Sequence, residues 1–244
     1  MNRPRPVDTA LPTEPADDPV VLRTERLTRC FGAGPGTIVA VRGVTTTVAP
    51  RARIAVTGPS GSGKSTLLHL LAGLDTPTSG TICWPPADPV EGDRAASVGL
   101  VFQGRSLVPN LNVLENVRLP LLFAGHTESE ATVRARDALD RLNLDALADA
   151  LPDTLSGGQA QRIAIARVLA TAPRLILADE PTGQLDHATA TVVIDVLLRA
   201  ADDLGSALIV STHDPLIARR LPTEWAMRDG RLRITTRTAD GPCR

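Results

Sequence analysis

A glycine-rich stretch, Gly58-Pro-Ser-Gly-Ser-Gly-Lys-Ser65, decides the fold of this chain. It follows a short apolar run, Arg53–Thr57, and opens a run with helical spacing, Lys64–Leu71. Strand, glycine-rich turn and helix in this order form the context of a P-loop, whose backbone N–H groups cradle phosphates at the positive end of the helix dipole. The sequence therefore predicts a nucleoside triphosphate site; the alternative is a plain glycine turn before a helix.

Two side chains in this stretch carry the expected chemistry. Lys64 is predicted to reach the β and γ phosphates, and the Ser65 hydroxyl is predicted to bind Mg²⁺. The predicted nucleotide-binding residues of the loop are Gly58, Pro59, Ser60, Gly61, Ser62, Gly63, Lys64, Ser65 and Thr66.

The basic composition points to the same position. Lys64 is the only lysine among 26 basic residues, all the others being arginine. A compact ammonium and a planar guanidinium are not interchangeable in a site closed around phosphates. A single lysine at this position therefore indicates that function requires lysine, and not arginine, here. Chance placement, at about one in 26, is the alternative.

A pair of acids ends a second apolar run, Leu175-Ile-Leu-Ala-Asp179-Glu180. Asp179 suits a Mg²⁺ shell, and Glu180 is placed to orient or deprotonate a water in line with the γ phosphate. For this pair alone an ordinary solvated turn remains the alternative. Two carboxylates at the end of a buried strand are costly without a cation, which favours the site.

A third motif, Leu155-Ser-Gly-Gly-Gln159, opens another helix and resembles the signature of ABC ATPases. The resemblance covers about residues 20–234. The segment Leu114–Leu122 is further similar to the lipoprotein-releasing, macrolide-exporter and cell-division type of these ATPases. The resemblance implies an α/β P-loop NTPase with the ABC ATPase fold. It also implies that Ser156 and Gly158 contact nucleotide phosphate. The implied nucleotide-binding residues outside the glycine-rich loop are Ser156, Gly157, Gly158, Gln159 and Asp186.

The same resemblance assigns further residues by position. Gln103 matches the Q-loop glutamine that touches Mg²⁺ or the attacking water, Asp186 lies in the D-loop, and His213 matches the switch histidine at the γ phosphate. The implied catalytic residues are Glu180, His213 and Gln103, and the implied Mg²⁺ ligands are Ser65, Gln103 and Asp179.

One aromatic residue is a candidate for stacking on adenine. The chain has no tyrosine, so the ring that the family usually supplies as tyrosine would here be Phe31, which keeps the ring and loses the hydroxyl. A buried core phenylalanine is the competing interpretation, and the sequence does not decide between them.

Composition limits the classes of protein that fit. With 244 residues, 43% of them hydrophobic, and a net charge of -1, the chain is not disordered throughout and is a poor nonspecific nucleic-acid binder. Its three cysteines have neither disulfide nor metal-ligand spacing, which fits a reducing compartment. No apolar run approaches the roughly 18 residues that cross a bilayer, so we expect no direct membrane insertion and a soluble cytoplasmic protein.

The domain layout follows from the pattern of apolar residues. Residues 1–19 are predicted to be a disordered proline-rich tail, 20–234 one ABC ATPase domain with a helical subdomain over about 104–160, and 235–244 a flexible tail. Antiparallel strands are expected from Val20 to about Val48, and a hairpin turn at Asp229-Gly230. Further strands are expected at Arg53–Thr57, Ser97–Phe102, Leu175–Ala178 and Leu208–Ser211. Helices are expected at Lys64–Leu71, Asn112–Leu122, Thr127–Leu142, Ser156–Leu169 and Thr189–Ala201.

The resemblance implies an ATP- and Mg²⁺-dependent ATPase subunit that forms a homodimer on ATP binding and drives a separate transmembrane permease. Such a subunit sits at the inner face of the cell membrane through its partner, which is expected to contact the surface around Gln103–Phe123. Two alternatives stay open: a soluble ABC ATPase acting on nucleic acid or the ribosome, and a nucleotide-regulated module without turnover. The single cassette argues against the first, and the full set of hydrolytic residues against the second.

Overall fold

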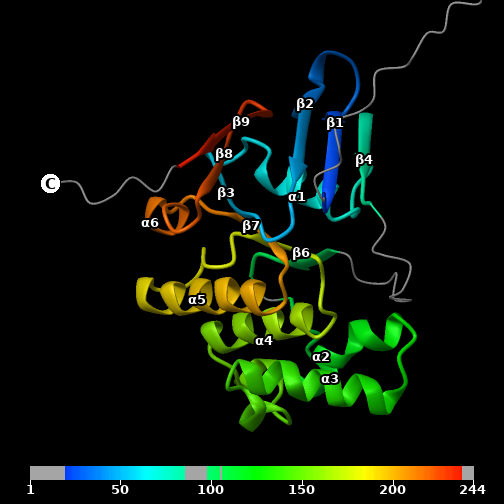
Figure 1. Cartoon of the computed structure of the whole chain (residues 1–244), viewed down its shortest axis with the longest axis vertical. Coiled ribbons are helices and arrows are strands. Elements are labelled where there is room, and N and C mark those ends of the chain that lie inside the picture. Colours follow the sequence, from blue (N-terminus) through cyan, green and yellow to red (C-terminus); the bar gives the residue numbers. More distant parts are fainter. Residues whose placement is uncertain (1–19, 86–97, 105, 238–244) are drawn as a thin grey trace, which may run out of the picture.

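Two β-sheets form the framework of the computed structural model, which describes residues 20–85, 98–104 and 106–237 (Figure 1). One sheet has three antiparallel strands in the order β2-β1-β4, and the other has six in the order β5-β6-β7-β3-β8-β9. In Figure 1 the three-stranded sheet lies at the top, and α2, α3, α4 and α5 fill the lower half. The helix α1 lies with the upper strands.

The strands follow from β-branched and apolar runs broken by turn residues. The antiparallel sheet comprises β1 (Leu22–Phe31), β2 (Ile38–Val48) and β4 (Ser79–Cys83). The strands of the larger sheet are β3 (Arg53–Thr57), β5 (Val98–Val101), β6 (Leu175–Asp179), β7 (Ala207–Ser211), β8 (Thr223–Arg228) and β9 (Arg231–Thr236). All its neighbours pair in parallel except the β8–β9 hairpin, which turns at Asp229-Gly230.

The central sheet separates two hydrophobic cores. Along β6, Leu175 and Leu177 pack in the core with α1 and the antiparallel sheet. Ile176 and Ala178 pack in the core built with α2, α3, α4 and α5. Successive side chains of a strand point to opposite faces, so a parallel strand covered on both sides reads as one continuous apolar run. This explains why β6 carries no alternation of polar residues.

Every α-helix in the described ranges except α1 begins at a residue whose side chain caps it. The α-helices are α1 (Lys64–Leu71), α2 (Val113–Phe123), α3 (Glu128–Arg141), α4 (Gly157–Leu169), α5 (His187–Asp203) and α6 (Pro215–Ala218). Short 3-10 turns lie at η1 (Gly34–Gly36), η3 (Asp145–Leu147) and η4 (Pro152–Thr154). The predicted capping box of Thr127 with Glu130 is present and starts α3.

The predicted elements agree with the structure to within a few residues. Arg53–Thr57 and Lys64–Leu71 have the predicted bounds, whereas α5 begins two residues before the predicted Thr189 because Asp186 caps it. The strand β9 ends at Thr236, beyond the predicted domain boundary at 234. The predicted tail 1–19, residue Ser97 of the expected strand 97–102 and residues 238–244 lie outside the described residues.

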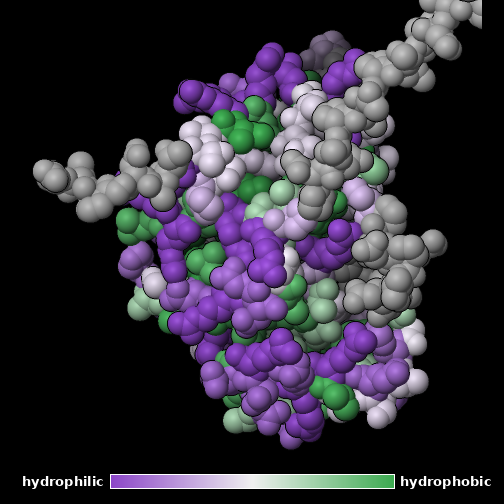
Figure 2. Space-filling view, in the orientation of Figure 1, coloured by the Kyte–Doolittle hydropathy of each residue, from purple (hydrophilic) through white to green (hydrophobic). Residues whose placement is uncertain are grey.

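The surface in view is mainly polar. Figure 2 shows hydrophilic residues over most of the face formed by α3, α4 and α5, with small hydrophobic patches between them. Within the described ranges, every helix is too short or too polar to cross a bilayer.

Candidate functional site

The glycine-rich loop joins β3 to α1 and packs closely against backbone atoms of β2 and β8. Gly63 has a φ of 101°, and a Cβ atom there would lie 2.0 Å from the carbonyl oxygen of Ala40 on β2. Gly58 has a φ of 143°, and its Cβ atom would lie 2.2 Å from the carbonyl oxygen of Met227 on β8. Both positions therefore require glycine, for backbone conformation and for space. The two sheets together fix the path of the loop.

The N-terminus of α1 differs from those of the other helices. The N-cap residue Gly63 makes no side-chain hydrogen bond. By contrast, every other α-helix in the described ranges has a capping side chain: Asn112, Thr127, Ser156, Asp186 or Asp214. Because the first N–H groups of a helix need partners, α1 presents unsatisfied donors and a positive dipole end to the loop. This arrangement suits an anion such as phosphate.

The Lys64 ammonium lies at the centre of the loop. The residue is only 6% exposed. Its Nζ atom donates to the carbonyl oxygens of Gly58, at 2.9 Å, and Pro59, at 3.1 Å, and lies 3.7 Å from Oε1 of Glu180. Two of the three ammonium donors are thus bound by carbonyl oxygens of the loop itself, and the charge lies beside an acid of the site.

Three predicted residues from three segments converge on the carboxylate of a fourth, Glu180. Besides Lys64, the Gln103 amide nitrogen donates to Oε2 of Glu180 at 3.3 Å, and Nδ1 of His213 lies 3.5 Å from the same oxygen. The Glu180 side chain is 19% exposed, whereas that of His213 is 66% exposed. Glu180 therefore stands at the meeting point of the loop, the segment after β5 and the segment after β7.

The two acids at the end of β6 have different surroundings. Asp179 is 4% exposed, and its Oδ1 atom accepts a hydrogen bond of 2.6 Å from the Ser211 hydroxyl. Glu180 adopts a left-handed backbone conformation, with a φ of 41°, which turns its side chain out of the strand. Its backbone N–H donates to the same Ser211 hydroxyl at 2.8 Å.

The predicted Mg²⁺ ligands are chemically suited to that ion. The Ser65 hydroxyl, the Gln103 amide and the Asp179 carboxylate offer hard oxygen donors, which Mg²⁺ prefers and completes with water and phosphate oxygens. Ser65 lies in the first turn of α1, next to the uncapped N–H groups. The donor set fits a nucleotide-bound Mg²⁺ better than an all-protein cage.

The signature residues lie on α4, away from the loop. The Ser156 hydroxyl accepts from the Gln159 N–H at 3.2 Å, and the Gln159 side chain accepts from the Ser156 N–H at 2.8 Å. This capping box leaves the Ser156 O–H proton as a donor. A hollow of about 530 Å³ is lined by Ser156, Gly157, Gly158, Gln159 and Asp186 together with neighbours on α5, and no residue of the 58–66 loop lines it.

The D-loop acid has a structural partner. The Asp186 side chain caps α5 by accepting from the Thr189 hydroxyl and backbone N–H. These two hydrogen bonds hold the pKa of the Asp186 carboxyl below its usual value. Gly157 and Gly158 pack against Leu185 and Thr189, so the signature and the D-loop of one chain form a single surface.

Phe31 is not a core residue. It is 42% exposed, and the Arg29 guanidinium carbon lies 4.6 Å from its ring centroid. The alternative of a buried core phenylalanine is therefore wrong. Phe31 pairs with Ile38 on β2, two residues from Ala40, whose carbonyl oxygen abuts Gly63.

Comparison with known proteins decides the family. Residues 41–183 match the ABC transporter family. The lipoprotein-releasing system ATP-binding protein LolD of Bordetella pertussis is 40% identical over 227 residues, covering 90% of this chain and 98% of that protein. The LolD protein of Legionella pneumophila is also 40% identical, over 87% of this chain and 97% of its own length.

Solved structures agree. The dimeric ATP-binding cassette MJ0796 bound to ADP and Pi superimposes with a TM-score of 0.79 at 34% identity, over 90% of this chain and 100% of that one. A second dimeric structure of the same bacterial ABC transporter cassette gives a TM-score of 0.78. This chain belongs to the ABC transporter family. It is an ATP-binding, ATP-hydrolysing subunit with the ABC ATPase fold.

Sequence reasoning missed some residues of this ABC cassette's site. Ser211 joins both acids, and Ala40 and Met227 brace the loop. The one sequence signal for Ser211 is its position, at the end of an apolar run and two residues before His213. The two bracing contacts use backbone carbonyls, which no residue type signals.

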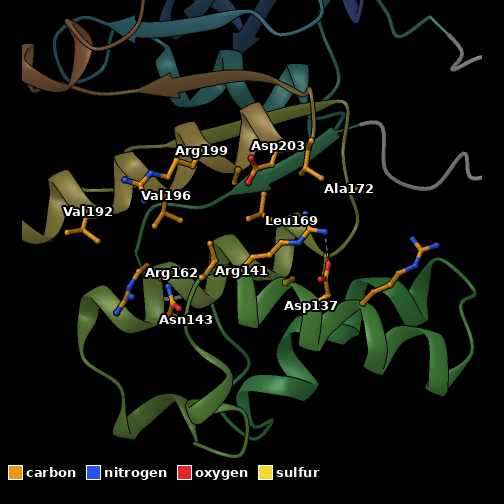
Figure 3. A pocket seen from close by; sticks show the side chains of 16 residues that line it. Asp137, Arg141, Asn143, Arg162, Leu169, Ala172, Val192, Val196, Arg199 and Asp203 are labelled. Carbon is orange, nitrogen blue, oxygen red and sulfur yellow. Dashed lines mark ion pairs between the residues drawn. The ribbon is translucent and has the colours of Figure 1, made fainter.

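A separate cavity in the cassette, of about 400 Å³, lies between α3, α4 and α5 (Figure 3). Leu169 and Val196 contribute apolar surface, and Arg141, which pairs with Asp137, lies at its edge. None of the predicted site residues lines this cavity. Its size therefore does not make it the nucleotide site.

Proposed function

We propose that the 58–66 loop binds Mg²⁺-ATP and that Glu180 is the general base of hydrolysis. The convergence of Lys64, Gln103 and His213 on the Glu180 carboxylate carries this proposal. A base must lie within reach of the proton that it removes, and a phosphoryl-transfer site needs cations and hydrogen-bond donors around the same point.

The steps follow from the groups present. The Glu180 carboxylate accepts a proton from water, the water oxygen attacks the γ phosphorus, and the bond from that phosphorus to the β-bridging oxygen breaks to release ADP. Lys64 and His213 donate hydrogen bonds to γ-phosphate oxygens. Gln103 orients the water, and the N–H groups at the start of α1 hold the β phosphate. Ser65, Gln103 and Asp179 would hold Mg²⁺, which when bound would supply positive charge against the charge that develops on the phosphates.

We propose further that ATP binding joins two copies of the chain. The signature of one chain lines a hollow that no residue of the 58–66 loop lines, so Ser156 of a second copy can donate its O–H proton to a γ phosphate that the first copy holds. Both structures of the related cassette are dimeric, which supports this arrangement. Phe31 would then stack on adenine, with Arg29 on its ring.

The output of the cycle is proposed to act on a separate membrane protein at the inner face of the cell membrane. The relatives are named as ATP-binding proteins of a lipoprotein-releasing system. Around Gln103–Phe123, three hydrophobic side chains are exposed: Phe102 by 39%, Val108 by 37% and Phe123 by 83%. Arg167 of α4 also donates to the carbonyl and hydroxyl oxygens of Ser106, both at 2.8 Å, which ties this surface to the signature helix.

Co-purification tests the partner. The chain is co-expressed with the membrane protein encoded beside its gene, and the complex is captured in detergent. Phe123→Asp is expected to abolish capture, whereas Leu216→Asp, an exposed hydrophobic position on α6, is expected to retain it. Equal capture of both variants would place the contact elsewhere. Phosphate release from the purified chain, or its absence, separates an ATPase from a module without turnover.

A further inference from the structure

Ser211 is the last residue of β7 and is fully buried, with 0% of its surface exposed. The parallel register of β6 and β7 sets it opposite Asp179. Its hydroxyl donates to Oδ1 of Asp179 at 2.6 Å and accepts from the backbone N–H of Glu180 at 2.8 Å. A single oxygen therefore connects the two adjacent acids of the site.

We propose that Ser211 is a positioning residue: its hydroxyl holds the Asp179 carboxylate and the Glu180 backbone N–H in fixed positions relative to each other. This inference rests on the proposed function, in which Asp179 is a Mg²⁺ ligand and Glu180 is the base. Within the described residues, the Ser211 hydroxyl is the only side-chain donor to the Asp179 carboxylate. An apolar side chain at position 211 would leave a buried carboxylate oxygen and a backbone N–H group without their partner.

The backbone of Glu180 explains why this hydrogen bond matters. A left-handed conformation is unfavourable for a residue with a side chain and persists only where neighbouring contacts determine it. In Glu180 that conformation, with a φ of 41°, aims the carboxylate at Lys64, Gln103 and His213. The N–H bond to Ser211 fixes the peptide that carries this turn. The Ser211 hydroxyl thus sets the direction of the base without touching the water or the nucleotide.

Two consequences separate this role from ordinary packing. Loss of the hydroxyl should weaken the Mg²⁺-dependent part of ATP binding, through Asp179, and turnover, through Glu180. Binding of nucleotide without Mg²⁺ should be unchanged, because it uses Lys64 and the N-terminus of α1, which Ser211 does not contact.

Threonine and valine at position 211 form a matched pair, since they have the same shape and differ only in the hydroxyl. Purified Ser211→Thr and Ser211→Val chains are titrated with a fluorescent ATP analogue, in EDTA and in Mg²⁺, and their turnover and thermal unfolding are measured. Relative to Ser211→Thr, Ser211→Val is expected to lose about 10- to 100-fold in turnover and in the Mg²⁺-dependent gain of affinity, as for a hydrogen bond to a charged group. Affinity in EDTA is expected to be equal.

The proposal would be overturned if Ser211→Thr and Ser211→Val had the same turnover and the same gain of nucleotide affinity on adding Mg²⁺. It would also be overturned if Ser211→Val lost as much nucleotide affinity in EDTA as in Mg²⁺. Where the added methyl group prevents folding of both variants, Ser211→Ala is compared with the unmodified chain by the same measurements and the same criteria. Glu180→Gln is measured in parallel. Full turnover of Glu180→Gln would refute the proposed function itself, whereas an inactive Glu180→Gln with equal Thr and Val variants would refute only the role of Ser211.

Discussion

At the scale of single residues, a buried ammonium sets the character of the site. Lys64 is enclosed by the carbonyl oxygens of Gly58 and Pro59 and lies near the Glu180 carboxylate. These acceptors surround one compact charge, and a planar guanidinium with five donors does not fit the same space. The geometry therefore accounts for one lysine in a chain whose other basic residues are all arginine.

Substitution of Lys64 tests this requirement. Lys64→Arg keeps the positive charge, and Lys64→Ala removes it. Both are expected to abolish tight ATP binding, because shape and charge are both needed at this position. Equilibrium dialysis with ATP measures the outcome. Tight binding by Lys64→Arg would show that charge alone suffices, and tight binding by Lys64→Ala would exclude the lysine from the phosphate site.

Glu180 allows a sharper separation of binding from chemistry. Glu180→Gln keeps the size of the side chain and its contact with Gln103 but removes the basic carboxylate. ATP binding is expected to persist, while phosphate release slows by roughly 10²- to 10⁴-fold, the usual effect of losing a general base. Steady-state phosphate release with a parallel binding measurement checks both. An unchanged turnover rate would remove Glu180 from the role of base.

Much of the site could be predicted from sequence at this scale, and the reason is local. Lys64, Ser156 and Glu180 stand in short motifs whose chemistry depends on neighbours in the chain. The role of Ser211 could not be predicted from the sequence, because it depends on the β6–β7 register, which places Ser211 opposite Asp179. The exposure of Phe31 likewise depends on strand pairing, so the sequence alone left its two interpretations open.

At the scale of secondary structure, the two helix starts that we propose to face phosphate differ in construction. The helix α1 begins without a side-chain cap, so its N–H groups remain available. The helix α4 begins with the capping box of Ser156 and Gln159, which holds the signature in shape while the serine proton stays free. The first helix start can cradle phosphate by its backbone, and the second can add a hydroxyl donor.

A pair of equivalent caps tests the special role of Ser156. Ser156→Ala and Thr127→Ala each remove the hydroxyl of a capping box, in α4 and α3 respectively. Both are expected to lower the free energy of unfolding by about 1 kcal/mol. Only Ser156→Ala is expected to lower ATP turnover, by about tenfold or more, the loss of one hydrogen bond to a charged group. Chemical denaturation measures the first effect and phosphate release the second. Equal turnover of the two variants would show that Ser156 only caps α4 and has no part in hydrolysis.

Element boundaries show where local signals suffice. The bounds of β3 and α1 follow from an apolar run and a glycine turn, both local features. Apolar spacing predicts the start of α5 two residues late, because the helix begins after its capping acid Asp186 and not at the first apolar position. The strand order β5-β6-β7-β3-β8-β9 could not be derived, because it depends on crossovers and on packing of the two cores.

At the scale of the whole molecule, the division into two cores accounts for the proposal that two chains form one active unit. The loop and Glu180 lie where the central sheet meets the antiparallel sheet, and the signature lies with the helices on the other side of the sheet. The hollow around Ser156 is lined by α4, α5 and the D-loop of the same chain, without the nucleotide loop. This separation supports the proposal that a second copy brings its signature to the γ phosphate.

Sedimentation velocity of the Glu180→Gln chain with ATP and Mg²⁺ tests this claim most directly, because slow hydrolysis lets the closed state accumulate. The expected result is a dimer that carries two nucleotides. This dimer is expected to dissociate to monomers in ADP and to fail to form in the Glu180→Gln, Ser156→Ala double variant. A chain saturated with one ATP that still sediments as a monomer would contradict it.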